Sequence, residues 1–127
     1  MKLLLDTHVL IWWDEGALPR AIREVCLDEA NTLVISAATV WELQIKEALG
    51  KLRLRTSVRT MVDEQLEVNG LEFLPISLRH IWELGNLPRL HGDPFDRMLV
   101  AQARYEGLTM LSADKGVREY PVNVLWE

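Results

Sequence analysis

The sequence predicts an α/β fold: a three-layer sandwich in which a central parallel β-sheet is flanked by helices. Short apolar runs alternate with longer amphipathic segments along all 127 residues, as in proteins built from strand–helix–strand units. The apolar runs are continuous, without in–out alternation, which is typical of strands buried on both faces. We therefore expect a single domain over residues 1–127, with any functional site beyond the carboxyl ends of the strands.

The first half of the chain carries clear helix boundaries between its apolar runs. In order, the expected elements are a strand at residues 2–5, a helix beginning at residues 9–13, a helix from residue 19 toward residue 31, a strand at residues 33–35 and a helix at residues 37–49. Pro19 suits the first turn of a helix because its missing N–H is not needed there. Ser36 is a favourable N-cap and Gly50 a favourable terminator for the helix between them.

The second half of the chain repeats this alternation. The expected elements are a helix capped by residue 56 or 57 and ended by residues 69–70, a strand at residues 73–76, a helix at residues 77–84, a loop at residues 85–92, a helix from residues 93–94 to 107, and strands at residues 108–111 and 122–125. Pro75 lacks a backbone N–H, so the strand around it is predicted at an edge of the sheet.

Composition excludes several classes of protein. The apolar fraction of 49% and the charged fraction of 26% are those of an ordinary globular domain. Cys26 is the sole cysteine, which excludes an internal disulfide and favours a small buried side chain. No apolar run approaches the roughly 20 residues of a membrane helix, and the N-terminus lacks a signal-peptide pattern, so we expect a cytoplasmic protein with no membrane association. The net charge of −5 counts against a basic nucleic-acid coat.

Acidic residues follow two of the predicted strands directly. Asp6 ends the first apolar run, and Asp114 follows the fourth within Leu111-Ser112-Ala113-Asp114. Helix capping alone would explain either residue. Parallel strands end at the same edge of a sheet, however, so neighbouring strands would bring both carboxylates within reach of one metal ion.

A third acid is predicted to turn inward at the start of a helix. Asp93 is a natural N-cap, which places Asp96 at the third helical position. Leu99, Val100 and Ala103 continue the line of Asp96 along the helix, so this line should be the buried one. We expect the positive end of the helix dipole to keep Asp96 ionised.

Glu42 lies within the helix predicted after the second strand. It shares a helical line with Ala38 and Lys46, and the spacing alone favours a surface ion pair between Glu42 and Lys46. A carboxylate aimed at a site, with Lys46 one turn further and close to a substrate phosphate, is the alternative. The apolar residues expected to face the core from this helix are Trp41, Ile45, Ala48 or Leu49, and Leu52.

Four carboxylates at one sheet edge would repel one another unless cations lay between them. They are Asp6, Glu42, Asp96 and Asp114. Oxygen ligands without a cluster of Cys or His favour Mg²⁺ or Mn²⁺ over zinc. Such ions activate water and stabilise the leaving oxygen of a phosphodiester. Two divalent cations would offset these four charges, so the −5 charge argues only against RNA binding without metal.

Four segments of the chain resemble the PIN-domain ribonucleases, and specifically the VapC-like toxins of type II toxin–antitoxin systems. They are Leu4-Leu5-Asp6-Thr7-His8, Ser36-Ala37-Ala38-Thr39-Val40-Trp41-Glu42-Leu43, His91-Gly92-Asp93-Pro94-Phe95-Asp96-Arg97 and Leu111-Ser112-Ala113-Asp114. The resemblance implies Mg²⁺- or Mn²⁺-dependent RNA cleavage at an acidic site of Asp6, Glu42, Asp96 and Asp114. It also implies a homodimer and a cognate antitoxin whose tail enters the site. Asp93 matches a subgroup with an extra Asp before Pro-Phe-Asp-Arg.

The resemblance leads to a hypothesis for each site residue. Asp6, Asp96 and Asp114 would hold one or two ions, with Glu42 and Asp93 as further candidate ligands. Glu42 would ligate the metal, or orient and deprotonate the attacking water. The candidates for substrate binding are Lys46, Arg97 and Ser112. Arg97 would bind a phosphate through its guanidinium, although a salt bridge to neighbouring acids is the commoner role of such an arginine. Ser112 would support Asp114 by a hydrogen bond.

Two further groups of residues carry structural expectations. Trp12 and Trp13 are adjacent and cannot share one helix face, so one of them should lie at an interface, whereas Trp82 should be in the core. Lys51, Arg53 and Arg55 form the one basic cluster of the chain. We expect it to be a solvated edge whose intervening leucines point inward, with tracking of an RNA backbone as the alternative.

Other functions remain open from sequence. A catalytically inactive PIN-fold module that binds proteins is the main alternative. A response-regulator receiver would carry paired acids after its first strand, and a haloacid-dehalogenase-type phosphatase would carry a second Asp two residues after Asp6. Thr7 and His8 stand in those positions.

Overall fold

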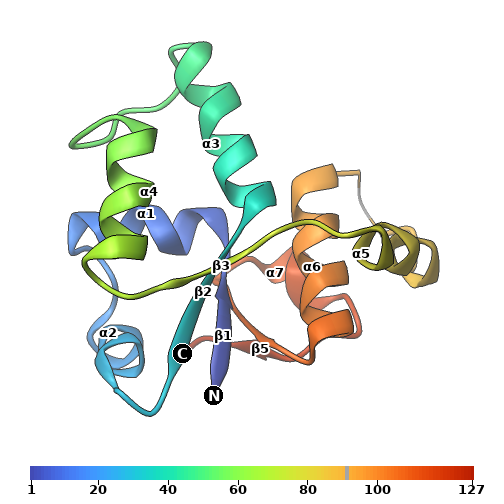
Figure 1. The fold of residues 1–127 in the computed structure, drawn as a ribbon. Helices are drawn as coiled ribbons and strands as arrows, with labels where there is room; N and C mark the ends of the chain where they lie inside the picture. Colours follow the sequence, from blue (N-terminus) through green and yellow to red (C-terminus); the bar gives the residue numbers. More distant parts are fainter. Residues whose placement is uncertain (91) are drawn as a thin grey trace.

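The computed structural model describes residues 1–90 and 92–127 as a three-layer α/β sandwich (Figure 1). His91, part of one segment that carries the resemblance, lies outside the described residues. In chain order the elements are β1 (Lys2–Leu5), α1 (Thr7–Glu15), α2 (Arg20–Leu27), β2 (Thr32–Ser36), α3 (Ala37–Ala48), α4 (Val58–Glu67), β3 (Glu72–Leu74), α5 (Leu78–Glu83), the 3₁₀ helix η1 (Leu84–Asn86), α6 (Pro94–Glu106), β4 (Thr109–Leu111), α7 (Lys115–Arg118) and β5 (Val124–Leu125).

The described strands form one parallel sheet in the order β3-β2-β1-β4-β5. β1 lies at the centre, where Leu4 pairs with Val34 of β2 and with Met110 of β4. The predicted α/β fold with a central parallel sheet is therefore confirmed. β3 lies at an edge, as expected from the proline that follows it.

Each face of the sheet has its own hydrophobic core, because successive residues of a strand point to opposite faces. Leu3 and Leu5 pack with residues of α1, α2 and α4, whereas Leu4 packs with residues of α6 and α7. α3 stands at the carboxyl end of β2 and contributes Leu43 to the first core and Ala38 to the second. The continuous apolar runs are thus explained by burial from both sides.

Local signals placed most helix starts correctly. Ser36, Ser57 and Asp93 each accept a backbone N–H as the N-cap of the helix that follows. Several element bounds differ from expectation: α1 begins at Thr7, β5 begins at Val124 and η1 extends into the predicted loop. α2 ends at Leu27, where Asp28 adopts an extended backbone, four residues before the predicted end near Asn31. β3 ends at Leu74, because the next residue is a proline and cannot continue the ladder.

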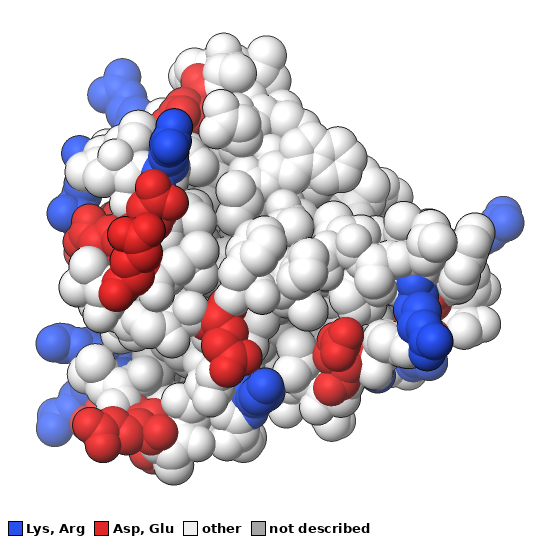
Figure 2. All heavy atoms as spheres, viewed as in Figure 1, with Lys and Arg blue, Asp and Glu red and all other residues white. Residues whose placement is uncertain are grey.

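The apolar stripe of α3 was predicted to face the core, and this prediction is wrong. Trp41 is 59% exposed, and Ile45 and Leu49 are exposed as well, while Glu42 on the neighbouring line is buried. Trp82 on α5 was also placed in the core and is 67% exposed. Helical spacing identifies an apolar face but does not say what covers it. Figure 2 shows the consequence, a broad area without charged residues over α3 and α6.

Smaller expectations hold. Cys26 is buried. Leu52 and Leu54 pack partly against the first core, and the alternating basic residues Lys51, Arg53 and Arg55 are exposed. Arg55 of this basic cluster forms an ion pair with Asp14. Within residues 1–90 and 92–127, no helix combines the length and the apolar character needed to cross a bilayer.

Candidate active site

The predicted acids gather at the carboxyl edge of the sheet, where the strand order changes direction. From β1 the chain proceeds outward to β2 and β3 on one side, and β4 and β5 lie on the other. The crevice between the ends of β1 and β4 is therefore a topological switch point, the usual binding position in open α/β sheets. The backbone N–H of Asp6 donates to the carbonyl of Leu111 at 3.2 Å and joins the two strand ends.

Asp6 is held rigidly at the bottom of this crevice. Its side chain is 5% exposed, and its Oδ1 accepts the backbone N–H of Val9 at 2.8 Å as the N-cap of α1. Its Oδ2 accepts a hydrogen bond from the hydroxyl of Ser112. Burial raises the pKa of Asp6 above its usual value, although the bonds to Ser112 and Val9 and the charge of His8 oppose the shift.

Ser112 joins both strand-end acids. Its hydroxyl donates to Asp6, and its Oγ also accepts the backbone N–H of Asp114 at 3.1 Å. The prediction that Ser112 supports Asp114 is thus correct for the backbone of Asp114, while the carboxylate that Ser112 contacts is that of Asp6. Asp114 itself caps α7, with Oδ1 accepting the N–H of Gly116 at 2.7 Å.

Glu42 enters the site from α3 and is 8% exposed. Its Oε1 accepts a hydrogen bond from the hydroxyl of Thr7 at 2.7 Å, and its Oε2 accepts one from Lys46 at 2.8 Å. The Glu42–Lys46 pair therefore exists, but as a half-buried contact beside the strand ends and not on an open surface. Sequence reasoning missed Thr7. Its position next to Asp6 could have indicated a place in the site, but its hydrogen-bond partner Glu42 is 35 residues away in the sequence.

Asp96 occupies the third position of α6, as predicted, and is half-buried at the mouth of the crevice. The helix dipole was expected to favour the ionised form of this carboxyl, but burial and neighbouring charges act in the opposite direction. Burial raises its pKa to about 6, helped by the charges of four other acids. In order of effect, these acids are Asp93, Asp114, Glu42 and Asp6. The four include every other residue predicted for the acidic site, so the structure brings the whole set together.

Asp93 lies beside the cluster but serves the backbone of α6. Its Oδ1 accepts the N–H groups of Phe95 and Asp96, at 2.9 and 3.2 Å. Capping is therefore a sufficient explanation for one of its oxygens. Among the other acids, its charge still has the largest effect on the pKa of Asp96.

The donor set suits a hard divalent cation. As the side chains stand, no group of three His, Cys, Asp or Glu residues within the described part of the chain is drawn tightly enough to enclose an ion. The available donors are carboxylate oxygens, which Mg²⁺ and Mn²⁺ prefer, and Mg²⁺ commonly binds through one or two carboxylates and several waters. The pKa of Asp96 is raised mainly by burial and further by the charges of the other carboxylates, and a bound cation would offset both effects by favouring the ionised form.

The two basic candidates have different partners. Lys46 is bonded to Glu42 and partly exposed beside it. The guanidinium of Arg97 donates to the carbonyl of Pro88 at 2.9 Å and to the hydroxyl of Tyr120 at 3.1 Å. These bonds do not pair Arg97 with the acids, and a contact between Arg97 and a substrate phosphate remains a prediction. In this structure Arg97 ties the segment after η1 to the end of α7.

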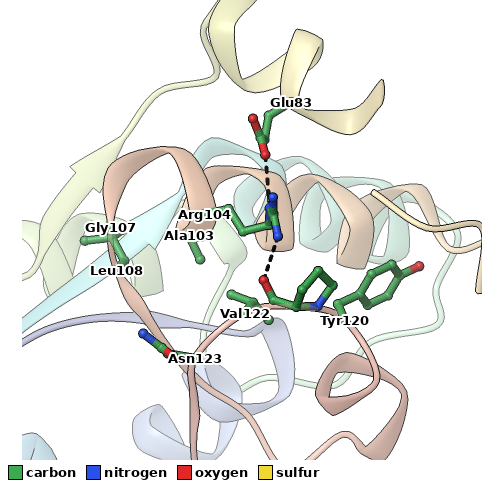
Figure 3. Close-up of a pocket in the computed structure, with 9 residues that line it drawn as sticks. Glu83, Ala103, Arg104, Gly107, Leu108, Tyr120, Val122 and Asn123 are labelled. Carbon is green, nitrogen blue, oxygen red and sulfur yellow. Dashed lines mark hydrogen bonds and ion pairs between the residues drawn. The ribbon is translucent and has the colours of Figure 1, made fainter. Parts of the chain in front are cut away.

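A cavity of about 560 Å³ lies at the amino ends of the strands, on the side of the sheet opposite the acids (Figure 3). It is lined by the end of α6, the start of β4 and the segment before β5. Arg104 crosses it and bonds to Glu83 at 3.0 Å and to the carbonyl of Pro121 at 2.8 Å (Figure 3). The cavity therefore holds a structural ion pair and is separate from the acidic crevice.

Comparison with known families decides the assignment. Residues 3–123 match the sequence model described as PIN domain, which covers nearly all of the chain. The chain belongs to the PIN domain family. Among curated proteins, none matches this PIN domain.

Solved structures share the fold of this PIN domain over almost their whole length. VapBC2 from Rickettsia felis bound to a DNA fragment from its promoter has a TM-score of 0.74 and 19% identity, covering 100% of both chains. DNA-bound VapBC from Salmonella typhimurium has a TM-score of 0.70 and 20% identity, covering 98% of this chain and 97% of the other. FitAcB from Neisseria gonorrhoeae has a TM-score of 0.65 and 22% identity, covering 98% and 96%. At these identities, the likeness establishes the fold.

Proposed function

We propose that this PIN domain is a Mg²⁺- or Mn²⁺-dependent endoribonuclease and the toxin of a cytoplasmic toxin–antitoxin pair. The observation that carries the proposal is the convergence of five acids at the switch point, where Asp93, Asp114, Glu42 and Asp6 all raise the pKa of Asp96. Crowded carboxylates of this kind at a sheet crevice mark functional sites, because a stable fold has no need of their repulsion. The resemblance of all four acidic segments to VapC-like ribonucleases supports the same reaction.

The roles follow from how each side chain is held. Asp6, Asp96 and Asp114 would bind the metal, which when bound would supply an activated water and stabilise the leaving oxygen. Asp93 is an additional candidate ligand through its second oxygen. Glu42 is anchored through Oε1 by Thr7 and through Oε2 by Lys46, so it is placed to orient the attacking water and accept its proton. Lys46 is close enough to this point to meet a substrate phosphate.

The proposal includes two protein partners. Proteins of this fold are found in VapBC and FitAcB complexes, and the resemblance to VapC-like toxins supports a cognate antitoxin for this chain. For the homodimer, we propose that the interface is the largely apolar face formed by the exposed stripes of α3 and α5. A second copy of the chain fits this face because the face carries few charges. Two copies related by a two-fold axis would therefore bring few like charges together.

The contacts of this face fit an interface. Trp41, Ile45 and Leu49 line one side of α3, and the ring of Trp41 meets that of Phe95 on α6 at 5.1 Å. On the other side of α6, α5 exposes Leu78, Ile81 and Trp82. Exposed apolar residues gathered on one face are typical of interaction surfaces.

RNA cleavage by the purified protein tests the enzymatic proposal. We expect single-stranded RNA to be cut in Mn²⁺ or Mg²⁺ and left intact in EDTA, and a folded Asp6→Asn variant to be inactive. Asp63→Asn, which changes an exposed carboxylate on α4, is the matched control and should remain active. Full activity in Asp6→Asn would contradict the site, and a wild-type protein that binds Mn²⁺ but leaves every RNA intact would support the alternative of an inactive protein-binding module.

A further inference from the structure

A small cavity beside the acids has an aromatic wall. It has a volume of about 280 Å³ and is lined by Asp6, His8, Trp12, Ala113 and Asp114. His8 and Trp12 are four residues apart on α1 and therefore lie on one face of that helix. The cavity thus has carboxylates on one side and two aromatic rings on the other.

The aromatic wall continues away from the acids. The ring centroids of His8 and Trp12 are 6.0 Å apart with the planes tilted by 39°, and Trp126 follows Trp12 at 6.0 Å and 46°. These three residues, called the aromatic shelf below, come from α1 and from the segment after β5. The shelf extends from the acidic crevice toward the C-terminus.

Trp12 and Trp13 both pack partly against the first core, but they differ in their polar contacts. The indole N–H of Trp13 donates to the buried side chain of Gln65 at 2.7 Å, so Trp13 is a structural residue. Among residues 1–90 and 92–127, no hydrogen bond engages the indole of Trp12, which is half-buried and lines the cavity, and His8 is exposed. The expectation that one member of this pair lies at an interface remains a prediction, and Trp12 is the member that lines a cavity.

We infer that the aromatic shelf binds a base of single-stranded RNA next to the phosphodiester that the acids act on. This inference rests on the proposed function. Aromatic side chains hold unpaired bases by stacking, and duplex RNA does not offer its bases in this way. Continuity with the acidic cavity argues for the substrate as the occupant. The cavity lies below the usual range for small-ligand sites, so it has room for about one base.

Stacking explains how an acidic protein holds RNA near its metal site. The shelf residues Trp12 and Trp126 are uncharged, so they attract the bases without depending on the phosphate charges. Base stacking is tolerant of sequence, because every base has an aromatic face. The shelf would therefore position the strand and select single-stranded over paired RNA at this site.

Binding of a short labelled single-stranded RNA, measured by fluorescence anisotropy in Mn²⁺, tests the inference. A Glu42→Gln background prevents turnover, and a gel confirms that the RNA stays intact. We expect Trp12→Ala to weaken binding by about 5- to 100-fold and Trp12→Phe to restore most of it. Phe73→Ala, which removes an exposed aromatic ring on β3, is the matched control and should bind normally.

A second ligand separates stacking from a loss of structure. An oligonucleotide with the same sugar–phosphate chain but abasic positions should bind equally weakly to the parent and to Trp12→Ala. Unchanged binding of intact RNA by Trp12→Ala, or equal weakening for intact and abasic strands, would overturn the inference. A parent protein that neither binds RNA nor cleaves it in its wild-type form would overturn the proposed function instead.

Discussion

The hydroxyl of Ser112 donates a hydrogen bond to Oδ2 of Asp6, linking the carboxyl ends of β4 and β1. The same oxygen of Ser112 accepts the backbone N–H of Asp114. One buried side chain thereby fixes the orientation of one strand-end acid and the backbone position of the other. A site at this edge takes one acid from the end of each strand, and Ser112 holds these two acids in a fixed position relative to each other.

Removing this link should loosen the metal site without dismantling the fold. We predict that Ser112→Ala weakens Mn²⁺ binding by about 10- to 100-fold, as expected when a group that orients a metal ligand is removed. Isothermal titration calorimetry measures the affinity, and Ser57→Ala provides the control. Ser57 caps α4 at a distance from the acids, so its loss should lower stability by about 1 kcal/mol and leave Mn²⁺ affinity unchanged. Equal Mn²⁺ affinity in Ser112→Ala and the wild type would contradict this role.

Asp96→Asn should stabilise the metal-free protein at neutral pH. The pKa of Asp96 is raised from 3.8 to about 6, so the folded state binds more protons than the unfolded state between these values. Stability therefore falls as pH rises through this window, and the full penalty is present above it. Allowing for solvent screening of a half-buried group, we expect a gain of about 1–2 kcal/mol at pH 7.5 in the variant.

Urea unfolding in EDTA at pH 7.5 and at pH 4 measures this gain. The difference between Asp96→Asn and the wild type should largely disappear at pH 4, where the wild-type carboxyl is protonated in the folded state. Asp63→Asn, which changes an exposed acid, should show little effect at either pH. A variant that is less stable than the wild type at pH 7.5 would show that Asp96 is not under electrostatic strain.

Thr7 is predicted to act through Glu42. Thr7→Val keeps the shape of the side chain and removes the hydroxyl that donates to Glu42 Oε1, so one anchor of the proposed base is lost. We expect kcat for RNA cleavage to fall by about 10-fold with KM nearly unchanged, which corresponds to a hydrogen bond of ordinary strength. Thr7→Ser, which retains the hydroxyl, should restore activity. A rise in KM together with a fall in kcat that Thr7→Ser does not rescue would indicate a packing role instead.

The exposed stripes of α3 and α5 predict the oligomeric state. We expect the wild-type protein to sediment at twice its monomer mass of 14.6 kDa and Ile45→Asp or Trp82→Asp to sediment as monomers, because a two-fold interface would bury the new charge twice. Val68→Asp places the same charge on a highly exposed residue after α4 and should leave the dimer intact. A monomeric wild type, or a dimer disrupted equally by Val68→Asp, would exclude this face.

Sequence was informative where one local rule decides the structure. Leu3, Leu4 and Leu5 form a continuous apolar run, and only a strand covered on both faces buries all three. The acids after β1 and β4 were found because strand direction alone fixes the edge at which they emerge. Caps such as Ser36 depend on neighbours within three residues and were equally predictable.

Sequence was uninformative where distant partners decide. Trp41 and Ile45 show the spacing of a core face, but an interface has the same spacing, and only the packing of α3 against α6 distinguishes them. The role of Thr7 depends on Glu42. The pKa of Asp96 depends on burial and, besides the nearby Asp93, on acids from three distant parts of the chain. A helix dipole is a local effect that sequence reveals, whereas burial and the summed field of distant carboxylates appear only in the fold.

Titration of Mn²⁺ into the metal-free protein tests most directly whether the acidic crevice is a metal site. Calorimetry should show saturable Mn²⁺ binding by the wild type, affinity reduced at least about 10-fold in Asp96→Asn, and unchanged affinity in Asp63→Asn. Absence of binding by the wild type, or equal affinity in Asp96→Asn, would contradict a catalytic metal held by these carboxylates.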